Sequence, residues 1–177
     1  GFVDWNPNTP DKNMGLWRGV KLTQSGRVSI ENIAITSKIN LTDYSTAELT
    51  INAVLENHSS KPVKGILKSK IEGGIEIETP YELGANEIKH ITLNKENAEA
   101  LSISNPRLWW PVNMGKPELY KAEFAVFENE SLSFQKNERF GIREIGDYTF
   151  NIGTEVHRGY MINGKKVLIK GGGWVDD

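Results

Sequence analysis

The chain has 177 residues, and its 21 Lys and Arg against 23 Asp and Glu give a formal net charge of -2. A balance this close to neutral provides no strong attraction for nucleic acid or for an anionic membrane surface, so neither is expected as a partner. The absence of cysteine excludes disulfides, thiol nucleophiles and thiolate metal ligands, and it leaves the cellular compartment open.

The first fifteen residues combine proline and asparagine with no hydrophobic alternation. Such a stretch cannot be a regular strand, because proline removes a backbone donor from a β-ladder. Gly1–Gly15 is therefore expected to be a loop that belongs to an element before it.

From Arg27 onward, apolar residues recur at every second position in short runs, which is typical of half-buried strands. The alternation is clearest in Ala47–Asn57, Val63–Ile71 and Tyr120–Val126. Weaker runs occupy Val28–Ile39, Ile75–Thr79, Ile88–Leu93 and Ser131–Ile145. About seven strands with turn-rich connections predict an all-β fold, an immunoglobulin-like antiparallel β-sandwich. The best helix candidate, Lys95–Leu101, is too short to change the class.

The tail has a different pattern from the middle of the chain. Asn163-Gly164 is a hairpin turn signal between Tyr160–Ile162 and Val167–Ile169. The second of these runs leads into three consecutive glycines, Gly171–Gly173. An apolar strand followed by such a flexible stretch needs a further segment to pack on. We therefore expect this chain to be part of a longer protein, and residues 149–177 to be largely irregular without their neighbours.

Five short motifs follow one another along the chain. They are Asp4-Trp5-Asn6-Pro7, Gly15-Leu16-Trp17-Arg18-Gly19-Val20-Lys21-Leu22, Asn105-Pro106-Arg107-Leu108-Trp109-Trp110-Pro111, Phe140-Gly141-Ile142-Arg143, and the stretch from Asn163-Gly164-Lys165 to Trp174. In this order they resemble glycoside hydrolase family 2, in particular its exo-β-D-glucosaminidase and β-mannosidase branches. The resemblance spans the whole chain.

The resemblance implies a parent with a jelly-roll sugar-binding domain, an immunoglobulin-like sandwich and a (β/α)8 barrel that carries two catalytic glutamates. Residues 1–20 would then be the end of the jelly roll and a linker. Residues 21–146 would be the sandwich, and residues 147–177 a hairpin and the first barrel strand. The chain would be the non-catalytic spacer of an exo-acting retaining glycosidase, inactive alone and without cofactor. Its partners would be those neighbouring domains and, in the parent, a carbohydrate substrate.

The same resemblance implies substrate-binding residues at both ends of the chain. Asp4 and Trp5 match a loop that reaches the sugar pocket, where a carboxylate can accept hydroxyl hydrogen bonds or pair with a sugar ammonium and an indole can cover the ring. Trp174 and Asp177 match a pattern at the first barrel strand, with Asp176 as the alternative acid. The competing interpretation is that Asp4 caps a turn beside an anchoring Trp5, and that the acids at the tail are simply solvated.

Several other residues invite a functional interpretation that the pattern does not favour. In the family that the motifs resemble, the catalytic acid follows an asparagine, and Glu87, Glu130 and Glu138 each follow one here, but all three fall in turns or at strand starts. The lone histidines lack metal-site spacing, so no metal is expected. Trp109 and Trp110 are interpreted as packing groups. The lysines at positions 61, 64, 68 and 70 are expected to form the solvated face of one strand and to protect its edge.

A second hypothesis is a stand-alone β-sandwich that binds carbohydrate or protein through exposed aromatic residues. The unfinished glycine-rich tail favours the spacer, because a binding module would end on a strand or a polar loop. The sugar, whether glucosamine, mannose or galactose, stays open. A periplasmic or secreted parent is the expectation for location.

Overall fold

A computed structural model describes residue 16 and residues 18–171 of the chain. Ser25–Leu168 forms one compact unit, and the remaining residues at the two ends form a second. Within the described residues, no helix is long and apolar enough to cross a membrane.

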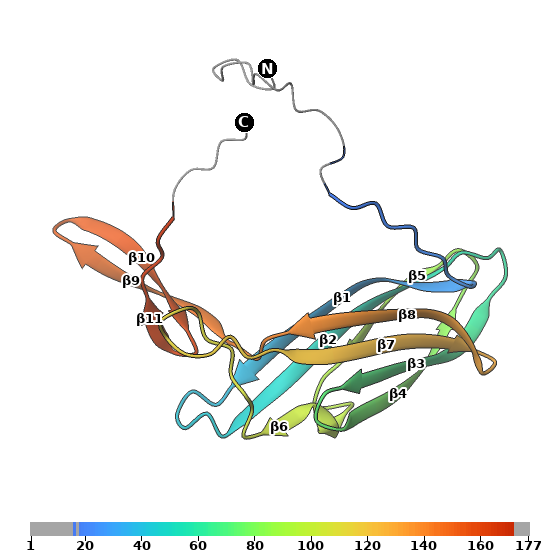
Figure 1. The fold of residues 1–177 in the computed structure, drawn as a ribbon, viewed down its shortest axis with the longest axis horizontal. Coiled ribbons are helices and arrows are strands. Elements are labelled where there is room, and N and C mark those ends of the chain that lie inside the picture. The colour runs from blue at the N-terminus through green and yellow to red at the C-terminus, as the bar shows by residue number, and fades with distance from the viewer. Residues whose placement is uncertain (1–15, 17, 172–177) are drawn as a thin grey trace, which may run out of the picture. The chain divides into compact units, whose positions relative to one another are not determined.

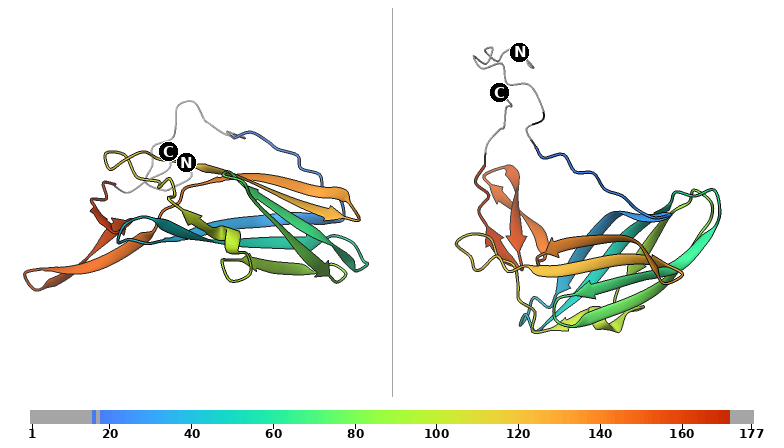
Figure 2. Two further views of the ribbon diagram at one scale, coloured as in Figure 1. Left: turned by 90° about the horizontal axis from the view of Figure 1, so that it is seen from below. Right: turned by 45° about the vertical axis from the view of Figure 1, so that its right-hand side comes forward.

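Two antiparallel sheets make up the sandwich (Figure 1). The first has the order β1 (Val28–Ile39), β2 (Thr46–Asn57), β5 (Ile88–Leu93), with the short β6 (Ser102–Ser104) also on β2. The second has the order β4 (Ile75–Leu83), β3 (Val63–Ile71), β7 (Tyr120–Glu128), β8 (Ser131–Phe140). Figure 2 shows the two layers from two further sides. The all-β sandwich predicted from the alternation is confirmed.

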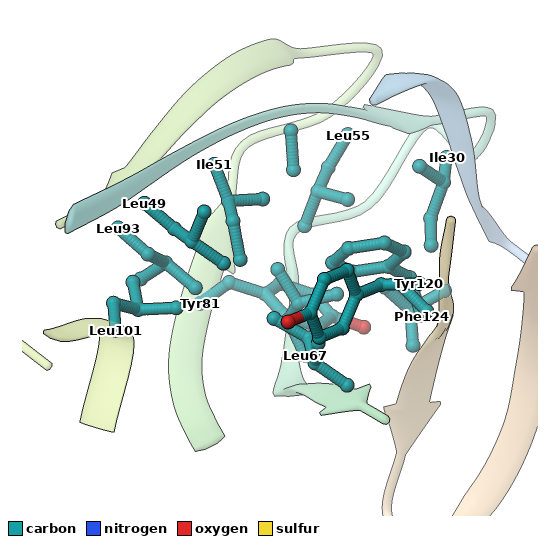
Figure 3. Packing of buried hydrophobic residues seen from close by; sticks show 14 of the residues in the cluster. Ile30, Leu49, Ile51, Leu55, Leu67, Tyr81, Leu93, Leu101, Tyr120 and Phe124 are labelled. Carbon is teal, nitrogen blue, oxygen red and sulfur yellow. The ribbon is translucent and has the colours of Figure 1, made fainter. Parts of the chain in front are cut away.

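The core lies between the sheets and follows the predicted alternation. On β2, Leu49, Ile51 and Leu55 are fully buried, and they face Leu67 of β3 and Phe124 of β7 (Figure 3). Because side chains alternate along a strand, a register slip of one residue would turn this whole set toward water. The hydrophobic pattern therefore fixes how the two sheets face each other.

A third sheet follows the sandwich in the chain and has the order β11-β10-β9. It consists of β9 (Ile145–Ile152), β10 (Glu155–Ile162) and β11 (Lys165–Val167). The hairpin at Asn163-Gly164 is confirmed, since Ile162 pairs with Lys165. The expectation of irregular chain from Thr149 is wrong as far as Val167. The turn between β9 and β10 contains Gly153 with φ +61°, but its Gly-Thr sequence is a weak hairpin signal.

Two smaller expectations also need correction. Of the helix candidate Lys95–Leu101, only a 3-10 turn at Glu99–Leu101 forms. The side chain of Asn94 accepts the backbone N–H of Glu96 at 3.0 Å, which favours a turn over a helix at the start of the segment.

The lysines of β3 do not protect a sheet edge, because β3 lies between β4 and β7. Lys68 and Lys70 instead pair across the strands with Glu78 at 2.6 Å and Glu76 at 3.2 Å. The edge strand β4 thus presents glutamates to solvent, and charge at an edge discourages pairing with another chain.

Leu67→Ala should lower the free energy of unfolding by about 2–5 kcal/mol, because Leu67 is fully buried and its truncation leaves a cavity. The matched control Leu132→Ala removes the same atoms from a side chain that is 53% exposed and should cost less than about 1 kcal/mol. Urea unfolding followed by tryptophan fluorescence measures both. Equal losses would contradict the assignment of the core.

Candidate functional site

The residues predicted to touch substrate, Asp4, Trp5, Trp174 and Asp177, lie outside the described residues, as does the alternative Asp176. Their placement therefore stays a prediction. The structure instead shows how three of the five sequence motifs relate to one another.

These three motifs converge where β8 leads into β9 (Figure 1). We call the convergence the motif junction. It consists of Tyr44, Trp109, Trp110, residues 141–144 and residues 163–165. In the sequence these motifs fall in separate strands and turns, and no local pattern indicates that they touch.

Asn163 is the centre of the motif junction. It has φ +49° and Gly164 has φ +75°, so together they form the two-residue turn between β10 and β11. Asn163 is fully buried although it lies in a turn. Buried amide groups require partners, because an unpaired one loses its bonds to water without compensation.

Every polar group of Asn163 has such a partner. Its backbone N–H donates to the Glu144 carbonyl at 2.8 Å, and its Oδ1 accepts the Glu144 N–H at 2.8 Å. Its Nδ2 donates to the Trp109 carbonyl at 3.0 Å, and its own carbonyl accepts the Tyr44 hydroxyl at 3.0 Å. One residue thus ties the terminal hairpin to the linker after β8, to the Trp-Trp loop and to the loop before β2.

Trp109 joins the same linker from the other side. Its N–H donates to the Ile142 carbonyl at 2.9 Å, and the Arg143 guanidinium lies 4.5 Å from the centre of its ring. A Cβ at Gly141 would lie 2.6 Å from the Cβ of Trp109, so the glycine of this motif permits the close approach. Arg143 is held in turn by Ser37, whose hydroxyl accepts its backbone N–H at 3.0 Å.

Trp110 packs on residues from two other segments. The edge of its ring contacts Tyr44, with centroids 6.0 Å apart, and the Lys165 ammonium lies 4.8 Å from its ring centre. Both indoles are half-buried, and a cation of the chain lies over each ring. They therefore serve the packing of the junction, as their interpretation as packing groups requires.

Arg107, from the same motif as the two tryptophans, anchors this loop to the second sheet. Its backbone N–H donates to the Tyr120 hydroxyl at 2.8 Å, and its guanidinium donates to the Glu72 carboxylate at 2.7 Å. The pKa of Glu72 lies below its ordinary value, first because the Lys121 backbone N–H donates to this carboxylate and second because Arg107 does.

The three glutamates that were given no catalytic role from the sequence occupy ordinary surface positions. Glu87 accepts the Gly84 N–H within a turn, and Glu130 is exposed in the β7–β8 turn. Glu138 lies 3.7 Å from the Lys136 ammonium on β8. No catalytic role is assigned to any of them.

Sequence reasoning missed one group of side chains. Glu31 on β1, Glu56 on β2 and His58 directly after β2 offer ligand atoms within 4.8 Å of one another. A register irregularity at Glu31 brings it beside Ser29, which the alternation does not reveal. The Ser29 hydroxyl joins Glu31 to the His58 ring, so the groups satisfy one another, and we assign no metal to them.

Comparisons with known proteins find relatives of this chain. A family model for glycosyl hydrolases family 2 matches residues 28–143. An exo-β-D-glucosaminidase of Streptomyces avermitilis is 30% identical over 177 residues, which is 100% of this chain and 19% of that protein. One of Arthroderma benhamiae is 31% identical over 188 residues, which covers 100% of this chain and 20% of that protein.

The chain is also similar to solved structures. The crystal structure of the exo-chitosanase of Amycolatopsis orientalis superposes with a TM-score of 0.80 at 29% identity, over 100% of this chain and 20% of that one. A β-D-mannosidase of Dictyoglomus thermophilum, with a TM-score of 0.66 at 22% identity over 90% of this chain and 19% of that one, shares the fold. The chain thus spans about a fifth of the length of these relatives.

Asn163→Gly should lower the free energy of unfolding by roughly 2–4 kcal/mol, because it leaves the Trp109 carbonyl and the Glu144 N–H without their partner. Glycine tolerates positive φ, so backbone strain does not contribute. The matched control is Asn129→Gly, since Asn129 occupies the first position of a two-residue turn between β7 and β8 with φ +44° but is exposed. Chemical denaturation of both variants measures the difference, and equal effects would refute the role of Asn163.

Proposed function

Because the chain belongs to glycosyl hydrolases family 2, we propose that it is the non-catalytic spacer of an exo-acting retaining glycosidase that removes terminal β-linked sugars. The observation that carries the proposal is the match over all of this chain to proteins about five times its length. A piece of that size corresponds to one structural domain with its flanks.

Glucosamine is the first candidate for the sugar. The relatives from Streptomyces and Arthroderma are both named exo-β-D-glucosaminidase, at 30% and 31% identity over the whole chain. Mannose is the second, since a mannosylglycoprotein endo-β-mannosidase of Lilium longiflorum is 28% identical over 97% of this chain.

The spacer function rests on the motif junction. In the proposed division, residues 1–20 end the jelly roll, residues 21–146 are the sandwich, and residues 147–177 open the barrel. Asn163 binds the linker and the Trp-Trp loop of the sandwich to the hairpin from which the barrel would start. Such a tie sets the direction in which the next domain begins, so loops from neighbouring domains can meet in one pocket.

In that pocket we place Asp4 and Trp5 from one side and Trp174 and Asp177 from the other. The carboxylates would accept hydrogen bonds from sugar hydroxyls or pair with the ammonium of glucosamine, and the indoles would cover the ring. The acid and the nucleophile, two carboxyl groups about 5–5.5 Å apart in retaining enzymes, would come from the barrel.

The chain alone should hydrolyse no chromogenic glycoside, because in this proposal the catalytic carboxyl pair lies outside it. The assay uses p-nitrophenyl β-D-glucosaminide, β-D-mannoside and β-D-galactoside. Turnover that disappears on substitution of Glu87, Glu130 or Glu138 by Gln would show that a catalytic site lies in the sandwich itself.

In the full-length parent, Asp4→Ala and Asp177→Ala should each lower kcat/KM by an amount equivalent to roughly 2–4 kcal/mol, because each removes a charged partner from a buried polar group of the sugar. The loss should be larger for the amino sugar than for its hydroxyl analogue, since an ammonium without a counter-charge is costly to bury. Asp43→Ala, in an exposed turn of the sandwich, is the control and should leave kcat/KM unchanged. Values near those of the control would remove both acids from the pocket.

A further inference from the structure

The turn at the centre of the motif junction holds the only Asn-Gly pair of the sequence, Asn163-Gly164. Asparagine is a chemically labile residue, and it is most labile when glycine follows it. Glycine has no side chain to hinder its backbone nitrogen, so that nitrogen can reach the side chain of the preceding asparagine. The junction is therefore built around the dipeptide with the greatest tendency to modify itself.

The reaction needs only base and water. The Gly164 backbone nitrogen loses its proton and attacks Cγ of Asn163. The new N–Cγ bond closes a succinimide ring, and Nδ2 leaves as ammonia. Water then opens the ring at either of its carbonyl carbons. One opening gives aspartate, and the other gives isoaspartate, in which the backbone runs through the side chain and gains a methylene group.

The structure leaves the nucleophile of this reaction available. Gly164 is exposed, so base can reach its nitrogen. The Tyr44 hydroxyl donates to the Asn163 backbone carbonyl at 3.0 Å, and this carbonyl belongs to the same peptide group as the Gly164 nitrogen. A donor on that oxygen draws electrons from the peptide group and makes its N–H more acidic. Any protection must therefore come from the asparagine side chain.

The side chain of Asn163 is held at both of its polar atoms. Nδ2 donates to the Trp109 carbonyl at 3.0 Å, and Oδ1 accepts the Glu144 N–H at 2.8 Å. Attack turns the planar Cγ tetrahedral and expels Nδ2, so the reaction must disrupt this arrangement and leave buried groups unpaired. Asn163 is also 0% exposed, which keeps the water for ring opening away from it. The closed junction thus opposes the reaction at the electrophile.

Modification would prevent the junction from closing again. Aspartate and isoaspartate both lack Nδ2, so the Trp109 carbonyl loses its donor and faces a carboxylate instead. Burial of a charge without a partner is costly. Isoaspartate also lengthens a turn that has only two residues between the paired Ile162 and Lys165. Opening of the junction is reversible before the reaction and irreversible after it.

We propose that Asn163-Gly164 is a self-modification site that the closed motif junction keeps unreactive, and that its conversion to aspartate or isoaspartate permanently releases the terminal hairpin from the Trp-Trp loop and the linker after β8. The lifetime of the junction is then set by how often it opens. This inference concerns the junction alone and holds whichever sugar the parent cleaves.

The first test compares the folded chain with the chain unfolded in urea, both incubated in the same mildly alkaline buffer. Mass spectrometry of the peptide that contains Asn163 measures the loss of ammonia and the gain of water over time. The folded chain should react at least about tenfold more slowly, because a protected group reacts only on local opening. Equal rates in the two samples would overturn the proposal.

A second test loosens the junction while the sandwich stays folded. A Cβ at Gly141 would lie 2.6 Å from the Cβ of Trp109, so Gly141→Ala should push Trp109 away from Asn163. The matched control is Gly146→Ala, whose Cβ would meet the Met161 Cε at an ordinary 3.5 Å.

Modification at position 163 should be at least about threefold faster in Gly141→Ala than in the wild type and unchanged in Gly146→Ala, because only the first variant favours local opening. Circular dichroism and urea unfolding identify the folded samples. A folded Gly141→Ala that reacts at the wild-type rate would refute the role of the junction. If this variant does not fold, the comparison of folded and unfolded wild-type chain decides the matter.

A third test examines the consequence of the modification. The modified chain carries an added negative charge and can be separated by ion exchange from the unmodified chain. Hydrogen exchange should be faster in β9, β10 and β11 of the modified chain and unchanged in β2, since only the hairpin loses its attachment. Asn163→Asp reproduces the loss of the donor without isoaspartate and should show the same pattern. Exchange in the hairpin that is the same before and after modification would contradict its release.

Discussion

The burial of Asn163 inside a tight turn is the constraint on which the rest of the junction depends. A turn of this kind needs positive φ at both of its central residues, and Asn and Gly are the residues that adopt it most readily. Gly at both positions would satisfy the backbone. Only a side chain with a donor and an acceptor can also satisfy both the Trp109 carbonyl and the Glu144 N–H. Asn meets both demands at once.

The ties within the junction are mostly neutral. Its central hydrogen bonds join amides, a carbonyl and a hydroxyl and involve no charged side chain. The charged contacts, such as Arg143 over Trp109, lie around this centre. Salt screens exposed charges far more than buried amide bonds, so the geometry between sandwich and hairpin should hold over a wide range of ionic strength. The ion pairs between the lysines of β3 and the glutamates of β4 lie on the outer face of the sandwich, where they place charge at the edge of the sheet.

The sequence predicted the sandwich well, because its strands carry one apolar face and their alternation is local information. Val63–Ile71 and Ile88–Leu93 were predicted with the bounds that the structure gives. It failed at β9 (Ile145–Ile152), where apolar residues alternate but residues from 149 onward were expected to be largely irregular. The role of Asn163 was also out of reach. Its turn is a local signal, whereas its bonds join residues 54 and 119 positions away in the chain, and only the fold brings these together.

The motif junction holds the terminal hairpin at more than one point. A single point of attachment joins two bodies but lets one rotate about it. Asn163 binds the Glu144 backbone and the Trp109 carbonyl, and the Lys165 ammonium lies 4.8 Å from the ring centre of Trp110. Because these contacts come from different residues of the hairpin, rotation about any one of them would break the others. In the proposed function, a spacer needs this arrangement if loops from domains on either side of it are to meet over one sugar.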